Sequence, residues 1–162
     1  MRELAAAVAL CALLAACGEP PIGIDIPDRA DGQQVLDTAG ILDGDEMEEA
    51  LDTVRSNRDL DIVALAYETE AANCGEAFRA GGALLEAWDA DIAVVAVARP
   101  GDFRSTGEDR RRCLGIRPRN EFAVPGSVRE EIVEVRVPPL ARENDWQAAF
   151  GVAVDGLVGA ML

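Results

Sequence analysis

Six charged residues of this sequence lie at or just beyond the ends of predicted strands, and their types could bind a metal ion or an anion. Three are carboxylates, the oxygen ligands that Ca²⁺ and Mg²⁺ prefer: Asp37, Glu68 and Asp102. Three are guanidinium groups, which can hold phosphate oxygens bidentately: Arg99, Arg104 and Arg110. Because ligands of open α/β sheets bind outside the carboxyl ends of the strands, we expect these residues to share one edge. The alternative, which we favour, is that they are helix caps, turn residues and a solvated rim.

The composition excludes most other chemistry. The 162 residues include no histidine and no lysine, so all 15 basic residues are arginines. Ser-His-Asp and Cys-His catalysis, His-ligated zinc, Schiff bases and P-loops are therefore excluded. The 30 acidic residues give a net charge of −15, which argues against a nucleic-acid partner and against docking on anionic lipid through a basic patch.

The N-terminus resembles a bacterial lipoprotein signal. Arg2 precedes an apolar run, Leu4 to Leu14, which suits a signal peptide and is too short to span a bilayer. The run closes on Leu14-Ala15-Ala16-Cys17, so we expect a signal peptide over residues 1–16 and lipidation of Cys17. This predicts an extracytoplasmic protein anchored to the cell membrane. Residues 17–34 hold prolines, glycines and scattered acids, and we expect a tether that keeps the domain, residues 35–162, clear of the headgroups.

Two further cysteines, Cys74 and Cys113, remain in the predicted domain. Outside the cytoplasm such a pair commonly forms a disulfide, here closing a loop of about 40 residues. A bridge requires that the two Cα atoms approach each other, which the sequence leaves open. The pair is therefore either a disulfide or two free thiols.

Helices and strands are predicted to alternate through the first two thirds of the domain. Asp43 with Glu46 predicts the cap of a first helix, and Asn73 with Glu76 the cap of a second that runs to about Trp88. Segments 61–67 and 91–98, which are apolar after an initial aspartate, predict two strands buried on both faces and, with the helix between them, parallel to each other.

The last third is predicted to hold an edge strand and two helices. Residues 110–116 predict an antiparallel strand whose arginines protect the sheet edge. Ser127 with Glu130 predicts a capping box, and Asn144 with Gln147 the start of a final helix. The fold class expected is a small α/β three-layer sandwich, a mostly parallel sheet with helices on both faces.

The order of these segments resembles the TPM domain family. The similarity covers about residues 35–162, and its most specific part is the block Val35-Leu36-Asp37-Thr38-Ala39-Gly40-Ile41-Leu42. It implies a membrane-tethered extracytoplasmic α/β domain, for which acid phosphatase activity, calcium binding and a role in photosystem repair are known in some members. This sequence departs from the family at Arg117, where an acid is expected, and at Arg79-Ala80-Gly81, where a Trp-Gly pair is expected after Phe78.

Two functions from different classes follow. The first, which we favour, is a lipid-anchored accessory module that binds envelope or membrane proteins, has no chemistry of its own and needs no cofactor. The second is an acid phosphatase assisted by Ca²⁺ or Mg²⁺ held near Asp37 and Asp102. Bound cation should raise the melting temperature only in the second case, since a ligand stabilises the state that binds it.

Overall fold

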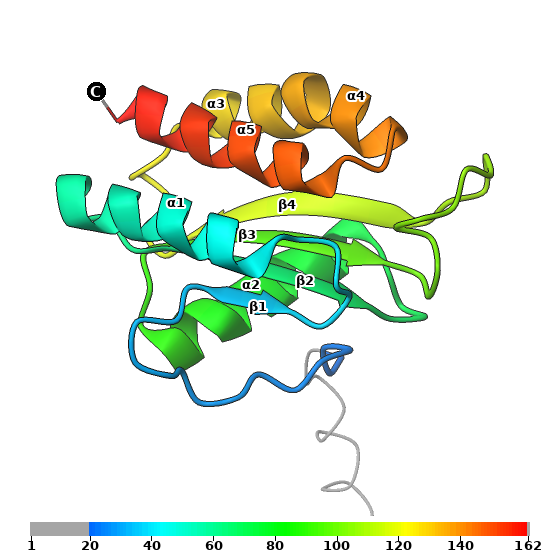
Figure 1. The fold of residues 1–162 in the computed structure, drawn as a ribbon, viewed down its shortest axis with the longest axis horizontal. Helices are drawn as coiled ribbons and strands as arrows, with labels where there is room; N and C mark the ends of the chain where they lie inside the picture. The colour runs from blue at the N-terminus through cyan, green and yellow to red at the C-terminus, as the bar shows by residue number, and fades with distance from the viewer. Residues whose placement is uncertain (1–19, 162) are drawn as a thin grey trace, which may run out of the picture.

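A four-stranded mixed sheet forms the centre of the molecule (Figure 1). The structure, a computed structural model, describes residues 20–161. The strand order is β1-β2-β3-β4, with β1 (Val35–Asp37), β2 (Ile62–Glu68) and β3 (Ile92–Ala98) parallel and β4 (Arg112–Pro118) antiparallel to β3. The predicted fold class and both buried strands are confirmed.

Alternate residues of β2 and β3 build two separate cores, one on each face of the sheet. Ile62, Ala64 and Ala66 of β2 face the first core, whereas Val63, Leu65 and Tyr67 face the second. Helices α1 (Gly44–Arg58) and α5 (Trp146–Ala160) cover the first face together with α3 (Gly126–Glu131) and α4 (Val137–Arg142), and α2 (Cys74–Trp88) covers the second (Figure 1). The molecule is thus a three-layer sandwich. Within the described residues, no helix has the length and apolar character needed to cross a membrane.

The first two helices begin as the sequence predicts. The side chain of Asp43 accepts a hydrogen bond from the backbone N–H of Glu46, at 3.1 Å, and that of Asn73 from the backbone N–H of Glu76, at 2.9 Å. Each helix ends at an aspartate in the left-handed conformation, Asp59 after α1 and Asp89 after α2, a conformation that a short polar side chain tolerates.

Three predicted boundaries in the last third are wrong. The edge strand begins at Arg112, two residues late, because the backbone N–H of Arg111 instead binds the Asp102 carboxylate. Helix α3 begins after Pro125 without a side-chain cap from Ser127. The final helix is capped by Asp145, which accepts from the Ala148 N–H. Its predicted cap, Asn144, lies one residue outside, at φ 63°.

A turn of π-helix, η1 (Ile132–Arg136), joins α3 to α4 and was not predicted. Pro138 and Pro139 follow it, and neither has the N–H that an α-helical carbonyl four residues earlier would need. The backbone N–H of Val137 bonds instead to the carbonyl of Ile132, five residues earlier. The prolines thus account for the wider turn, which aims α4 over the start of β4.

The described part of the predicted tether, residues 20–34, lies against the domain. Ile22, Ile24 and Ile26 alternate with exposed residues and pack on the core beneath α2. Arg29 pairs with Asp61 and also donates to the carbonyl of Trp88, whose indole N–H donates to the carbonyl of Pro27. The expectation of a free spacer is therefore wrong over these residues, and the alternation of isoleucines, typical of a half-buried extended segment, is the signal that was missed. The predicted signal peptide and Cys17 lie outside the described residues.

A buried carboxylate, Glu76, also binds the N-terminal part of this segment, at Gly23. Glu76 has no exposed surface and accepts hydrogen bonds from the backbone N–H of Gly23, the hydroxyl of Tyr67 and the guanidinium of Arg79. Burial raises the pKa of Glu76, but these hydrogen bonds outweigh it and leave the pKa below its usual value. Burial and the neighbouring carboxylate raise the pKa of Tyr67, which stays a neutral donor.

Candidate functional site

The carboxylate of Asp37, at the end of β1, holds the turn that follows the strand. Its Oδ1 accepts hydrogen bonds from the backbone N–H groups of Ala39 and Gly40, and its Oδ2 from those of Ile41 and Leu42, at 2.7–3.0 Å. Four backbone donors therefore occupy the carboxylate. The conspicuous Asp-x-Ala-Gly-x-Leu pattern encodes the turn that leads from β1 to α1.

The other two candidate carboxylates also bind groups of the chain itself. Glu68 Oε1 accepts from the backbone N–H of Gly101, at 2.9 Å. Asp102 is buried, accepts from the backbone N–H of Arg111 at 2.7 Å and pairs with Arg99 at 3.1 Å. The hydrogen bond from Arg111 and then the ion pair with Arg99 lower the pKa of Asp102. Both residues hold loops in place at the carboxyl edge of the sheet.

This arrangement does not fit the calcium site that the sequence suggested. Asp37 is saturated by backbone donors, and Asp102 already has a guanidinium at its oxygens. Among residues 20–161, no group of three or more His, Cys, Asp or Glu side chains is placed to hold a metal ion. The structure thus brings the predicted residues to one edge but uses the carboxylates as loop anchors.

The arginines at this edge are different, because several have no acidic partner. Eight arginines of the described chain form ion pairs. Those of residues 20–161 that form none are Arg58, Arg104, Arg110, Arg111, Arg112 and Arg142. Arg104 donates to the carbonyls of Ala39 and Gly40 and so closes the Asp37 turn. Most of the others gather around the start of β4.

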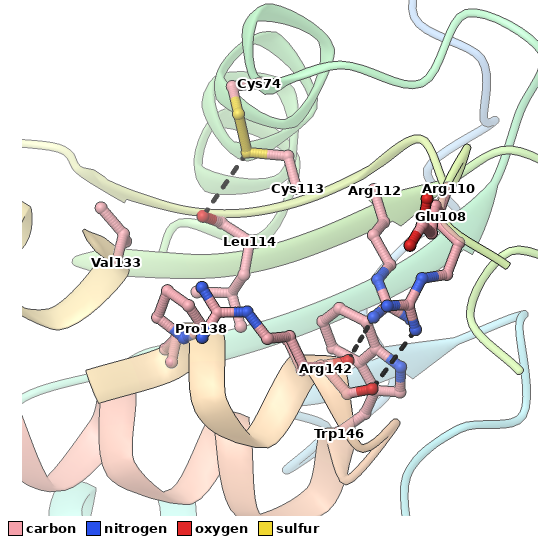
Figure 2. A pocket seen from close by; sticks show the side chains of 12 residues that line it. Cys74, Glu108, Arg110, Arg112, Cys113, Leu114, Val133, Pro138, Arg142 and Trp146 are labelled. Atoms are coloured by element: carbon pink, nitrogen blue, oxygen red, sulfur yellow. Dashed lines mark hydrogen bonds between the residues drawn. A yellow bond between two sulfur atoms is a disulfide. The ribbon is translucent and has the colours of Figure 1, made fainter. Parts of the chain in front are cut away.

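A cavity of about 390 Å³, which we call the arginine cleft, lies between the start of β4 and helix α4 (Figure 2). Arg110, Arg112 and Arg142 line it together with one acid, Glu108. Apolar groups form the remaining wall, mainly Leu114, Val133, Val137, Pro138 and Trp146. A second cavity of about 500 Å³ shares Arg110 and Arg112 and reaches the start of α2. The arginine run 110–112 therefore separates two hollows in an otherwise acidic protein.

Arg112 is held rigidly in the arginine cleft. Its Nη1 donates to Asn144 Oδ1 and to the carbonyl of Asp102, and its Nη2 donates to the carbonyl of Ala141. The guanidinium lies 5.3 Å from the ring centroid of Trp146, a cation–π contact. Trp146 is itself fixed, because its indole N–H donates to the carbonyl of Phe103 and its ring packs edge-on against Phe103. Burial, and next the charge of Arg110, lower the pKa of Arg112.

Arg110 lies beside Arg112 but is held more loosely. Both guanidinium groups reach the same acceptor, Asn144 Oδ1, from which Arg110 Nη1 lies 3.5 Å away. The same nitrogen donates to the carbonyls of Ser105 and Arg142, at 3.1 and 3.3 Å. Figure 2 shows the bonds from the two arginines to the carbonyls of the last two residues of α4, Ala141 and Arg142.

The predicted disulfide borders this cleft. Cys74 at the start of α2 and Cys113 in β4 are bonded, with Cα atoms 5.2 Å apart, and both line the two cavities. The bridge therefore joins the second-face helix α2 to the edge strand β4 next to Arg112 (Figure 2). The sequence left this pairing open, and the structure decides it in favour of the bond.

Sequence reasoning identified Arg110 but missed Arg112, Arg142 and Asn144. The run Arg110-Arg111-Arg112 was interpreted only as protection of the sheet edge, and Trp146 only as core, which it also is. The neglected signal is three consecutive cations in a chain with twice as many acids as bases. No protein-family model matches the sequence, and a search of curated proteins finds no match.

Proposed function

We propose that this protein is a lipid-anchored extracytoplasmic module of the cell envelope that acts by binding envelope or membrane proteins. The Cys74–Cys113 disulfide carries the location, since disulfides persist outside the reducing cytoplasm. The signal-like sequence that ends at Cys17 supports the anchor. The likeness of residues 35–162 to the TPM domain family points in the same direction.

The carboxylates at the carboxyl edge of the sheet support binding over catalysis. Asp37, Glu68 and Asp102 were the acids best placed for metal-assisted phosphate chemistry, and each accepts hydrogen bonds from the chain. In contrast, the arginine cleft offers cations and an apolar wall in a rigid frame, which suits recognition of a partner.

Lipid labelling tests the anchor. Cells that express the full chain would be grown with an alkyne-bearing fatty acid, and the protein would then be fractionated. Cys17→Ala is expected to abolish the label and to release the protein from membranes, because the thioether to lipid cannot form. Cys11→Ala, a cysteine change inside the predicted signal peptide, is the matched control and should keep both. An equal label in the two variants would refute the anchor.

Divalent cations distinguish the module from the phosphatase. Millimolar Ca²⁺ or Mg²⁺ should leave the melting temperature of the full chain unchanged, since the strand-end carboxylates already have partners. Hydrolysis of an aryl phosphate should stay at the level of buffer alone. A rise of several degrees together with turnover would replace the module by the metal-assisted enzyme.

A further inference from the structure

The arginine cleft holds two guanidinium groups side by side without a carboxylate between them. Arg110 and Arg112 share the acceptor Asn144 Oδ1, and neither forms an ion pair with any described residue. Neighbouring like charges repel, and a bound anion would remove that repulsion. In a chain of 30 acids and 15 arginines, a cluster of unpaired cations is not a consequence of composition.

The guanidinium nitrogens of Arg110 and Arg112 that have no partner in the described part of the chain are of the kind that binds a carboxylate. All hydrogen bonds of Arg110 to described residues come from Nη1, which leaves Nε and Nη2, the two nitrogens that together grip a carboxylate side-on. Arg112 likewise has no described partner for Nε. None of these nitrogens is among the fully enclosed side-chain atoms that lack a partner, so each keeps some surface open to water.

The residues around these guanidinium groups are already held in place. Arg112 is fixed by three acceptors and by Trp146, and the disulfide at the next residue, Cys113, attaches β4 to α2. A guanidinium that is held before binding loses little conformational entropy when an anion arrives, so a larger part of the interaction appears as affinity.

The apolar lining of the cleft favours a ligand that has an apolar group next to the acid. Leu114, Val137 and Pro138 line the cleft together with the cations, and its volume of about 390 Å³ lies in the range of small-ligand sites. An inorganic anion would leave this wall uncovered. A peptide that presents a carboxylate beside an aliphatic side chain would fill both parts.

We propose that the arginine cleft binds a peptide carboxylate with an adjoining apolar side chain, presented by a partner protein. The carboxylate is gripped by Arg110 and Arg112, with Arg142 at the rim, and the apolar side chain packs on Val137 and Pro138. The site deepens the proposed function, on which its biological meaning rests, by stating the chemistry of the partner. The carboxylate is either the C-terminus of the partner or an internal Asp or Glu.

Calorimetric titration of the full chain in detergent tests the site with three small probes. N-acetyl-leucine carries a terminal carboxylate, N-acetyl-aspartyl-leucinamide a side-chain carboxylate, and N-acetyl-leucinamide none. At least one of the first two should bind about tenfold or more tightly than the third, as expected for a charge-assisted bidentate pair. The better of the two identifies the source of the carboxylate. Affinity should fall as salt is added.

Two arginine variants provide a matched comparison. Arg110→Gln should weaken binding of the carboxylate probe about tenfold, because it removes the guanidinium whose Nε and Nη2 have no partner among residues 20–161. Arg58→Gln removes an equally unpaired cation at the end of α1, outside the residues that line the cleft, and should leave binding unchanged. Arg142→Gln, at the exposed rim, is a second test that leaves the Arg112 side chain in place. Circular dichroism checks that each variant is folded.

Three results would overturn the proposal: equal binding of the leucinamide, equal effects of Arg110→Gln and Arg58→Gln, or binding of inorganic phosphate without binding of either carboxylate. These outcomes differ from failure of the proposed function. Lipid label without carboxylate binding would leave the anchored module but remove the cleft as its site. Carboxylate binding without lipid label would leave the cleft and remove the anchor.

Discussion

Glu76 is the residue on which the attachment of the N-terminal segment depends most. It is a carboxylate without exposed surface that is satisfied by three donors, one of them the backbone N–H of Gly23 in the segment itself. A buried charge is tolerated only when its partners are present, so loss of the charge should affect both the helix and the segment.

Glu76→Gln should lower the free energy of unfolding by roughly 2–3 kcal/mol, because the hydrogen bonds lose their charged acceptor. Glu86→Gln changes an exposed glutamate on the same helix and should alter stability by less than about 0.5 kcal/mol. Urea unfolding at neutral pH measures both. Proteolysis within residues 20–34 should become faster only in the first variant. Equal stabilities would contradict the role assigned to Glu76.

The pH dependence of this effect has a defined sign. The pKa of Glu76 is below its usual 4.5 in the folded protein, so the unfolded state takes up its proton first as pH falls. The stability that Glu76 contributes is complete above about pH 5 and declines as pH drops through the lowered pKa. The difference between the native protein and Glu76→Gln should therefore shrink between pH 5 and pH 3 in urea titrations. A constant difference would mean that the charge is not the cause.

Residue types alone predicted which side chains lie at the carboxyl edge of the sheet but not what they do there. Asp37, Glu68 and Asp102 lie at that edge as expected, yet backbone donors occupy them, and a sequence does not show where N–H groups point. The cleft was missed because its lining residues come from the start of β4 and the loop before it, from α4 and from α5, which only tertiary packing brings together.

At the scale of elements, the sequence predicts best where periodicity and side-chain caps act locally. The runs that became β2 and β3, and the caps Asp43 and Asn73, are determined by neighbouring residues and are confirmed. The turn of π-helix and the late start of β4 depend on distant partners and on prolines that act several residues away. Local pattern therefore fails where tertiary contacts decide.

Two adjacent glycines in α2 give an element-scale test of packing. A Cβ on Gly81 would lie 2.9 Å from the Cβ of Arg117 in β4 and 3.3 Å from a methyl of Val95 in β3, whereas one on Gly82 would meet nothing within 4 Å. Gly81→Ala should destabilise the protein by about 1–3 kcal/mol by forcing α2 away from the sheet. Gly82→Ala should stabilise it by up to about 1 kcal/mol through helix propensity.

Thermal or urea unfolding of the two alanine variants measures this difference directly. Since both substitutions add the same methyl group to the same helix, intrinsic propensity cancels in the comparison. The same sign for both changes would show that α2 does not pack on β3 and β4 as closely as the structure has it.

For the whole molecule, the Cys74–Cys113 bond is a covalent cross-link between α2, on the second face of the sheet, and the edge strand β4. It closes a loop between residues 39 positions apart, so the double variant Cys74→Ser/Cys113→Ser should lose about 4 kcal/mol of stability on the chain-entropy model. The loss should match that caused by reducing the native protein. A titration that finds two free thiols in the unreduced, folded protein would remove the bond and its contribution.

With the proposed lipid on Cys17, the N-terminal segment would limit how far the domain can stand from the membrane. Pro20, although exposed, lines a hollow together with Ile22, Phe78 and Arg79, and only Gly18 and Glu19 separate it from Cys17. Three peptide units extend at most about 10 Å. A lipid on Cys17 would thus attach the domain to the membrane through a short tether. It would keep the Phe78 side of α2 toward the bilayer and restrict binding to partners that come to the membrane surface themselves.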